Sequence, residues 1–229
     1  MRVLGVIPAR GGSKSIFKKN MSDLNGKPLI HYSIKEALES KFLTELIVSS
    51  DDGEIIEYSK KNGATVPFIR PKEISTDNAL SASVVIHALE FMENFSKKKY
   101  DFVMMLQPTS PFRKSKHIDE CISMLKSNEC DSIVSIVNVD GYHPFRMKRL
   151  EGKKLVNYID QGFEDMRPRQ KLPNVYIRNG SIYLIKRDVL VKEKTLVGKQ
   201  CIGYEMNSYD SVNIDSKLDL LVARAIIES

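Results

Sequence analysis

Five short apolar runs separated by amphipathic stretches constrain the fold of this 229-residue chain more than any other feature. The runs are rich in branched side chains and predict buried strands at residues 3–7, 46–48, 103–106, 133–137 and 181–185. Between them, apolar side chains share one helical face in the stretches 30–38, 84–92 and 118–125. Alternating strands and helices predict a three-layer α/β fold, in which a mostly parallel sheet is covered by helices on both faces.

The alternation stops after Val137. Residues 138–179 show little sustained periodicity and contain Gly141, Pro144, Gly152, Pro168 and Pro173. Long irregular segments in compact domains are usually functional or mobile, so we expect this one to contact a partner subunit or to close over a ligand. A helical pattern returns at 218–226, with Asp215 or Ser216 as its predicted N-cap.

Composition limits the class of protein. A hydrophobic content of 42% suits one large domain over residues 1–229. The net charge of +6 comes from basic residues interspersed with 29 acidic ones, which predicts no nucleic-acid partner. Solvated surface faces explain most of the excess, and an anionic small substrate is the functional alternative. No apolar run approaches the roughly 18 residues of a membrane span, and no signal-peptide pattern occurs, so we expect a cytoplasmic protein without a membrane partner. The three cysteines match no metal-ligand spacing.

A glycine-containing loop follows the first predicted strand at Pro8-Ala9-Arg10-Gly11-Gly12-Ser13-Lys14. Open α/β sheets bind ligands at the carboxyl ends of their strands, which is where this loop begins. Its glycines let backbone N–H groups approach phosphate oxygens, while Arg10 and Lys14 supply cations and Lys18 and Lys19 extend the charge. The loop matches neither the P-loop nor the dinucleotide-binding motif. On the pattern alone, a phosphate site and a simple tight turn both stay open.

Three further polar clusters follow predicted strands. Ser49–Asp52 is best explained as the cap of the next helix. Arg70 follows the apolar pair 68–69, a predicted strand, and precedes a polar turn at 75–81. In Gln107–Arg113 two prolines fix the backbone and expose an amide and two hydroxyls, an arrangement suited to sugar recognition.

A last cluster precedes the C-terminal helix. Alternation places Asn213 and Asp215 on the same face of a short extended segment. Their oxygen atoms suit a hard divalent cation, whereas the alternative for Asp215 is a helix cap.

These segments, in this order, resemble the acylneuraminate cytidylyltransferases, or CMP-sialic acid synthetases, over essentially the whole chain. Residues 7–14 with Lys19-Asn20 are similar to the nucleotide loop of that family, and residues 106–113 are similar to its sugar-side motif. Pro168-Arg169-Gln170, Asn179-Gly180-Ser181-Ile182-Tyr183 and Ile214-Asp215 complete the series.

The resemblance implies a Rossmann-like nucleotide-binding fold and a homodimer, with a dimerisation segment at about residues 138–171 that reaches the neighbour's site. It also implies a Mg²⁺-dependent reaction typical of surface-polysaccharide biosynthesis. In that reaction the anomeric hydroxyl of a 2-keto sugar acid attacks the α-phosphate of CTP, with inversion at phosphorus, to give the CMP-sugar and pyrophosphate.

The same resemblance assigns roles to residues. The expected catalytic residues are Arg10, Lys14, Lys19 and Asp215. The expected nucleotide-binding residues are Ala9, Arg10, Gly11, Gly12, Ser13, Lys14, Asn20, Arg70 and Ser81, the last three near cytosine and ribose. The expected sugar-binding residues are Gln107, Thr109, Ser110, Arg169, Gln170 and Tyr183. Asp215 and Asn213 are the expected Mg²⁺ ligands.

Two departures from the family pattern bear on the substrate. Asn213 stands where sialic acid enzymes often have a second aspartate, which implies weaker or water-mediated metal binding. Residues 195–201 lack the paired aromatics that pack against the sugar in some members. N-acetylneuraminic, legionaminic and pseudaminic acid therefore all stay open as substrates.

Three alternatives compete with this interpretation. Kdo cytidylyltransferases share the fold and CTP, but their loop usually differs from residues 10–14. A glycosyltransferase is expected to carry an Asp-x-Asp motif, which the chain lacks. A non-catalytic nucleotide-binding paralogue is suggested by Asn213 alone.

Overall fold

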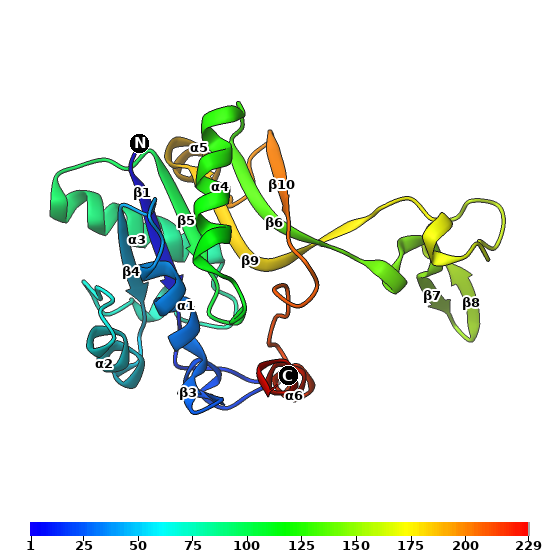
Figure 1. Cartoon of the computed structure of the whole chain (residues 1–229), viewed down its shortest axis with the longest axis horizontal. Coiled ribbons are helices and arrows are strands. Elements are labelled where there is room, and N and C mark those ends of the chain that lie inside the picture. The colour runs from blue at the N-terminus through cyan, green and yellow to red at the C-terminus, as the bar shows by residue number, and fades with distance from the viewer. Residues whose placement is uncertain (229) are drawn as a thin grey trace.

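A six-stranded sheet in the order β10-β6-β9-β5-β1-β4 forms the centre of the computed structural model, which describes residues 1–228 (Figure 1). Its strands are β1 (Val3–Pro8), β4 (Glu45–Ser49), β5 (Phe102–Leu106), β6 (Ser132–Asn138), β9 (Tyr176–Lys186) and β10 (Cys201–Glu205). Five of them run parallel, and β9 is antiparallel to both of its neighbours. The mostly parallel sheet predicted from the sequence is confirmed.

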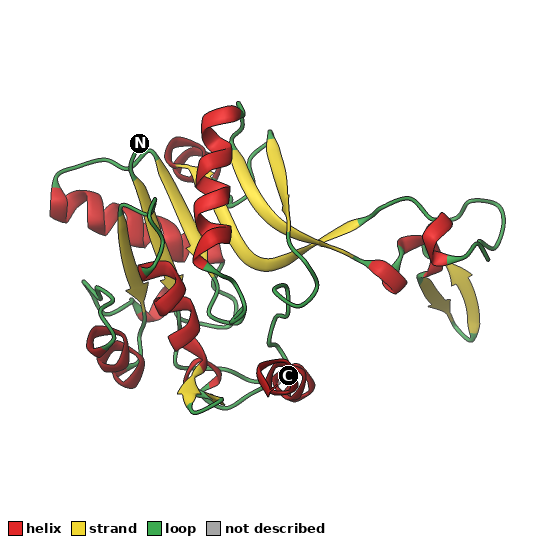
Figure 2. Ribbon diagram, in the orientation of Figure 1, coloured by secondary structure: helices red, strands yellow, loops and turns green. Residues whose placement is uncertain are grey.

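Helices cover both faces of the sheet (Figure 2). They are α1 (Leu29–Leu38), α2 (Gly53–Lys61), α3 (Ser81–Ser96), α4 (Ser115–Ser127) and α5 (Arg187–Glu193). The last helix, α6 (Lys217–Glu228), lies apart from the sheet and packs with Leu24, Leu29 and Phe112 in a separate cluster (Figure 1). Val3 and Ile7 of β1 pack in one core with α1, α2 and α4, whereas Leu4 and Val6 pack in a second core with α3 and α5. Because β1 is buried from both sides, its sequence is a continuous apolar run rather than an alternation. The three-layer α/β class is therefore confirmed.

Three elements carry no strong sequence signal. Helix α2 buries only Ile55 and Ser59, and α5 buries only Leu190, so neither has a long apolar stripe. Strand β10 lies at the edge of the sheet, where its residues are only half-buried or exposed. The predicted cap of α2 is confirmed, because the Asp52 carboxylate accepts hydrogen bonds from the backbone N–H groups of Glu54 and Ile55.

The cap of α6 is Ser216 rather than Asp215. The Ser216 hydroxyl accepts from the Asp219 N–H at 3.3 Å, and the Asp219 carboxylate accepts from the Ser216 N–H at 2.7 Å. This reciprocal pair is a capping box. Asp215 is left without a capping role.

An arm formed by residues 139–175 projects from the sheet between β6 and β9 (Figure 1). It carries the hairpin of β7 (Lys148–Glu151) and β8 (Lys154–Asn157) and three short 3-10 turns. The chain leaves the sheet at the end of β6 and returns at the start of β9, directly beside it. The arm is thus a long hairpin connection, which explains why β9 is antiparallel to β6. The arm exposes a group of large apolar side chains, namely Tyr142, Met147, Leu150, Leu155, Tyr158, Ile159, Phe163 and Met166.

The remaining strands, β2 (Asp23–Leu24) and β3 (Lys27–Pro28), form a small hairpin before α1. Across residues 1–228, no helix combines the length and the apolar character needed to cross a membrane.

The carboxyl ends of β1, β4 and β5 meet at one edge of the sheet because these strands are parallel neighbours. Leu106 at the end of β5 pairs with Ile182, so β9 passes the same edge at Asn179 and Gly180. The backbone N–H of Ile214 donates to the Thr109 carbonyl and ties the segment before α6 to this edge. The fold thus brings five distant parts of the chain together.

Candidate functional site

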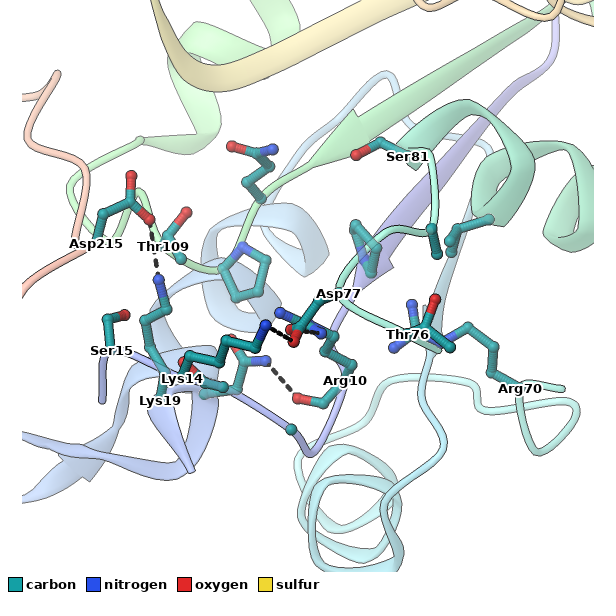
Figure 3. Close-up of a pocket in the computed structure, with 18 of the residues that line it drawn as sticks. Arg10, Lys14, Ser15, Lys19, Arg70, Thr76, Asp77, Ser81, Thr109 and Asp215 are labelled. Carbon is teal, nitrogen blue, oxygen red and sulfur yellow. Dashed lines mark hydrogen bonds and ion pairs between the residues drawn. The ribbon is translucent and has the colours of Figure 1, made fainter. Parts of the chain in front are cut away.

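A cleft of about 540 Å³ opens at this edge of the sheet (Figure 3). Twelve of the predicted site residues line it: Arg10, Gly12, Ser13, Lys14, Lys19, Asn20, Arg70, Ser81, Gln107, Thr109, Asn213 and Asp215. Segments far apart in the sequence therefore contribute to one site, as their places after the strands predict.

The glycine loop is shaped by contacts behind the cleft. A side chain at Gly11 would begin 2.5 Å from a carboxylate oxygen of Asp52, so only glycine fits there. The N–H groups of Ala9 and Gly11 already donate to the Ser49 carbonyl and to Asp51 Oδ1. Neither Ala9 nor Gly11 lines the cleft, and these two N–H groups are not free to bind phosphate. Gly12 and Ser13, the next two residues of the loop, do line the cleft.

Cations line the cleft, and in the structure they pair with acids. Asp77 accepts from Arg10 Nη1 at 2.5 Å and from Lys14 Nζ at 2.8 Å. These bonds, first that from Lys14 and then that from Arg10, hold the pKa of Asp77 below its usual range. Asp77 belongs to the polar turn at 75–81 and is not among the site residues predicted from the sequence. A carboxylate between two cations occupies a place that suits a phosphate group.

Arg70 lies at the back of the cleft with only 4% of its surface exposed. Burial lowers the pKa of Arg70, and the nearby Asp51 carboxylate, 3.4 Å from Nη2, opposes that effect. The predicted strand before Arg70 is wrong, because Ile69 makes only an isolated bridge with Ser50. Arg70 nevertheless reaches the cleft, since this bridge lays its segment beside the end of β4.

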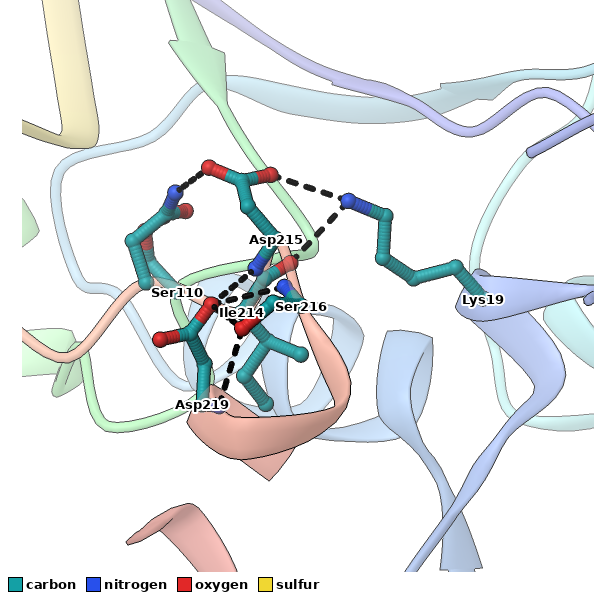
Figure 4. A network of polar contacts seen from close by, with 7 residues as sticks. Lys19, Ser110, Ile214, Asp215, Ser216 and Asp219 are labelled. Atoms are coloured by element: carbon teal, nitrogen blue, oxygen red, sulfur yellow. Dashed lines mark hydrogen bonds and ion pairs between the residues drawn. The ribbon is translucent and has the colours of Figure 1, made fainter. Parts of the chain in front are cut away.

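Asp215 forms a small polar network on the other side of the cleft (Figure 4). Its Oδ1 accepts from Lys19 Nζ at 2.9 Å, and its Oδ2 accepts from Asn213 Nδ2 at 2.5 Å. Lys19 Nζ also donates to the Ile214 carbonyl at 3.1 Å. The predicted placement of Asn213 and Asp215 on one face is thus correct.

A second pocket of about 440 Å³ adjoins the cleft, because Gln107 and Asn213 line both. Tyr183, predicted to bind sugar, lies in this second pocket. Gly180 forms its base with φ at +79°, and a side chain there would approach Gln107 Oε1 to 2.7 Å. Sequence reasoning assigned no role to Arg178 or Ser211, which also line the pocket.

Three predicted sugar-binding residues lie outside both pockets. Ser110 is fully buried, and its hydroxyl donates to Asn213 Oδ1 at 3.4 Å, so it supports Asn213 from behind. Arg169 and Gln170 lie in the arm, where Arg169 pairs with Asp140 at 3.2 Å. Within one chain the structure does not bring Arg169 and Gln170 to the site.

Arg113, the last residue of the predicted sugar-side motif, is a buried support of the site rather than part of its surface. It donates to the carbonyls of Gln107 and Ser181 and to the Ser33 hydroxyl, at 3.2, 2.8 and 2.6 Å. Burial lowers its pKa to about 10, so it stays charged at neutral pH.

Replacing Arg113 with methionine is expected to lower the free energy of unfolding by about 3 kcal/mol, because buried carbonyls lose their donor. Urea unfolding measures this change. The exposed neighbour Lys116 provides a matched control, and K116M is expected to stay within about 0.5 kcal/mol of the parent protein. Equal stability of the two variants would contradict the structural role of Arg113.

Known proteins with similar sequences identify the family of this chain. Residues 4–151 match the family model described as cytidylyltransferase. CMP-N,N'-diacetyllegionaminic acid synthase of Legionella pneumophila is 32% identical over 233 aligned residues, covering 100% of this chain and 97% of that protein. Pseudaminic acid cytidylyltransferase of Campylobacter jejuni is 50% identical over 111 residues, covering 48% of this chain and 47% of that protein.

Among solved structures, CMP:2-keto-3-deoxy-manno-octonic acid synthetase complexed with CTP superposes with a TM-score of 0.73. The match covers 100% of this chain and 99% of that one at 16% sequence identity, so it supports the fold alone. The family match, in contrast, spans more than half of the chain and includes both the glycine loop and the Gln107–Arg113 segment. The chain therefore belongs to the cytidylyltransferase family of nucleotidyltransferases.

Proposed function

We propose that this enzyme couples CTP to a nine-carbon 2-keto sugar acid and releases pyrophosphate. The observation that carries the proposal is the cleft itself, in which Arg10, Lys14, Lys19 and Arg70 surround one volume that continues into a polar pocket. A triphosphate suits the cationic part, and a polyhydroxylated acid suits the adjoining pocket. Relatives named for legionaminic and pseudaminic acid support this substrate class.

In the proposed reaction, the anomeric oxygen of the sugar forms a bond to the α-phosphorus as the bond from that phosphorus to the bridging oxygen breaks. The anomeric hydroxyl loses its proton to solvent water, and pyrophosphate leaves with the electron pair of the broken phosphorus–oxygen bond. Catalysis of this kind depends on positioning and on neutralising charge at the leaving oxygens. Arg10, Lys14 and Lys19 supply positive charge on the proposed triphosphate side, once Asp77 gives up Arg10 and Lys14 to the phosphates.

The donor groups fit a Mg²⁺ ion shared with the substrate. Mg²⁺ usually binds one or two carboxylates, substrate phosphates and water. Asp215 is the proposed protein ligand. In this structure the Asn213 amide turns its nitrogen to Asp215 and its oxygen to Ser110, so the amide would have to flip for that oxygen to serve as the proposed second donor. Within residues 1–228, no group of three or more His, Cys, Asp or Glu side chains is placed to hold a metal alone, which agrees with a shared site. When bound, the ion would supply charge neutralisation for the leaving pyrophosphate.

Pyrophosphate release tests the proposal. The purified protein is incubated with Mg²⁺, one of the four nucleoside triphosphates and each sugar of a panel containing N-acetylneuraminic, legionaminic, pseudaminic and Kdo acids. We expect release with CTP and at least one nine-carbon acid. Release with Kdo alone would favour the eight-carbon alternative, and CTP binding without turnover on any sugar would favour the non-catalytic paralogue. Because CTP is an intracellular metabolite, we also propose a cytoplasmic location.

We propose further that two copies of the chain form a homodimer through the arm. The arm exposes many large apolar side chains on a segment that projects away from the sheet (Figure 1). Exposed apolar patches of this kind are typical of interaction surfaces. Docking of the arm on a second copy would also bring Arg169 and Gln170 to the partner's sugar pocket, whereas they lie away from both pockets of their own chain.

The double variant L150E/L155E is expected to be monomeric and to lose most activity, because it places two carboxylates on the apolar hairpin of the arm. Light scattering coupled to size exclusion measures the mass. K153E places a glutamate in the exposed turn of the same hairpin and should remain dimeric. A monomeric parent protein with full activity would contradict the proposal.

A further inference from the structure

Asp51 lies behind the cleft at the end of β4 and touches two parts of the proposed nucleotide site. Its Oδ1 accepts a hydrogen bond from the Gly11 N–H at 3.1 Å. The same oxygen lies 3.4 Å from Nη2 of Arg70. Asp51 does not line the cleft, and Gly11 and Arg70 are the residues through which its contacts can affect a ligand.

The Arg70 side of this contact is a buried charge. Asp51 is its one acidic partner within residues 1–228, and Nε of Arg70 has no hydrogen-bond partner there. The positive charge of Arg10 also disfavours that of Arg70. Figure 3 shows these two arginines reaching toward the same cleft. Because an unpaired buried charge is costly, Arg70 depends on Asp51 to stay in place.

The Gly11 side of the contact fixes the glycine loop. Gly11 packs so closely on Asp52 that no side chain fits between them, and its N–H points at Asp51. The bond anchors the loop directly before Gly12 and Ser13, which line the cleft. Asp51 and Asp52 are adjacent in sequence but differ in role, since Asp51 accepts from the Gly11 N–H whereas Asp52 accepts from the N–H groups of Glu54 and Ile55 and caps α2.

We propose that Asp51 is a positioning residue. It fixes the glycine loop and Arg70 relative to each other, so that both contact the same CTP molecule. The inference rests on the proposed function for the identity of the nucleotide. A single oxygen atom, Asp51 Oδ1, then couples Gly11 of the loop to Arg70. The second pocket, which adjoins the cleft at Gln107 and is proposed to bind the sugar, is not part of this coupling.

Calorimetry of CTP binding to the full chain tests the inference with three variants. D51A loses both contacts and is expected to bind CTP about 100-fold more weakly, whereas D51N keeps an acceptor for Gly11 and is expected to lose about tenfold. D52A is the matched control, since it removes a helix cap and should lower the melting temperature with little change in CTP affinity. In kinetics, KM for CTP should rise in D51A while KM for the sugar acid stays within about twofold.

Hydrogen exchange without nucleotide separates this inference from the proposed function. The amides of residues 9–14 should exchange faster in D51A than in D51N or D52A, because D51A alone lacks an acceptor for the Gly11 N–H. If D51A matches D52A in both exchange and CTP affinity, the positioning role is wrong although the enzyme assignment stands. If D51A does not fold, the test rests on D51N, which conserves the shape of Asp51. The expected tenfold loss of CTP affinity in D51N then supports the positioning role, and unchanged affinity contradicts it. A parent protein that binds no CTP would overturn the proposed function and the coupling together.

Discussion

Replacing Asp215 with alanine is expected to lower kcat/KM for CTP by roughly 10²- to 10³-fold at any Mg²⁺ concentration. The variant loses the carboxylate that we propose as the Mg²⁺ ligand. It also leaves Lys19 without its acidic partner, so the lysine is free to move away from the position facing the triphosphate. Initial rates of pyrophosphate release over a series of Mg²⁺ concentrations measure the effect.

The capping box of α6 makes the interpretation of this variant clear. Ser216 and Asp219 cap the helix, so D215A should change the free energy of unfolding little. S216A is the matched control and is expected to cost about 1 kcal/mol of stability while activity is retained. If D215A were fully active but less stable, and S216A were unchanged in stability, Asp215 would be the cap and its proposed metal role would be wrong.

The core strands could be predicted because they are covered on both faces. A strand such as β1 must be apolar at nearly every position, and such a run is visible without any knowledge of its neighbours. Strand β10 has one neighbour and half-exposed residues, so its five positions resemble a loop. The short helices α2 and α5 bury too few side chains to produce a periodic stripe. What was missed is therefore what the core constrains least.

The candidate site follows a different rule. Parallel strands force their carboxyl ends to one edge, so polar residues after β1, β4 and β5 could be placed near one another from sequence. Their individual roles could not. Asp51 and Asp52 are chemically identical neighbours, and only the backbone direction sends one to Gly11 and the other to the N-terminus of α2. Arg113 ends the predicted sugar-side motif, and sequence alone does not tell that this arginine is buried.

Asp77 was overlooked for a related reason. An acidic residue is not an expected part of a site that binds a polyanion, and its contacts with Arg10 and Lys14 join segments more than sixty positions apart. In the structure it satisfies two cations that would otherwise repel each other. For a triphosphate to bind, Arg10 and Lys14 must release Asp77 and contact phosphate oxygens instead.

Because Arg10 and Lys14 are the proposed phosphate contacts, replacing Arg10 is the second change with a large expected effect on activity. R10A is expected to lower kcat/KM for CTP by roughly 10²-fold or more, because a half-buried guanidinium facing the proposed phosphates is lost. K14A should have a smaller effect, since the Lys14 side chain is 83% exposed and its charge is better screened by water. Steady-state kinetics with varied CTP concentration give both values, and equal kinetics of R10A and the parent protein would remove Arg10 from the site.

D77N is expected to change CTP binding in the opposite direction from R10A and K14A, so it tests the site more sharply. The amide keeps the shape of Asp77 but removes the charge that competes with phosphate, so CTP should bind more tightly, by about tenfold, as measured by calorimetry. In the R10A background the gain should shrink, because one of the two contacts that Asp77 must release is already absent. Weaker binding in D77N would instead show that Asp77 itself holds the bound nucleotide. The sign of this one change thus distinguishes a carboxylate that stands in for phosphate from one that contributes to the complex.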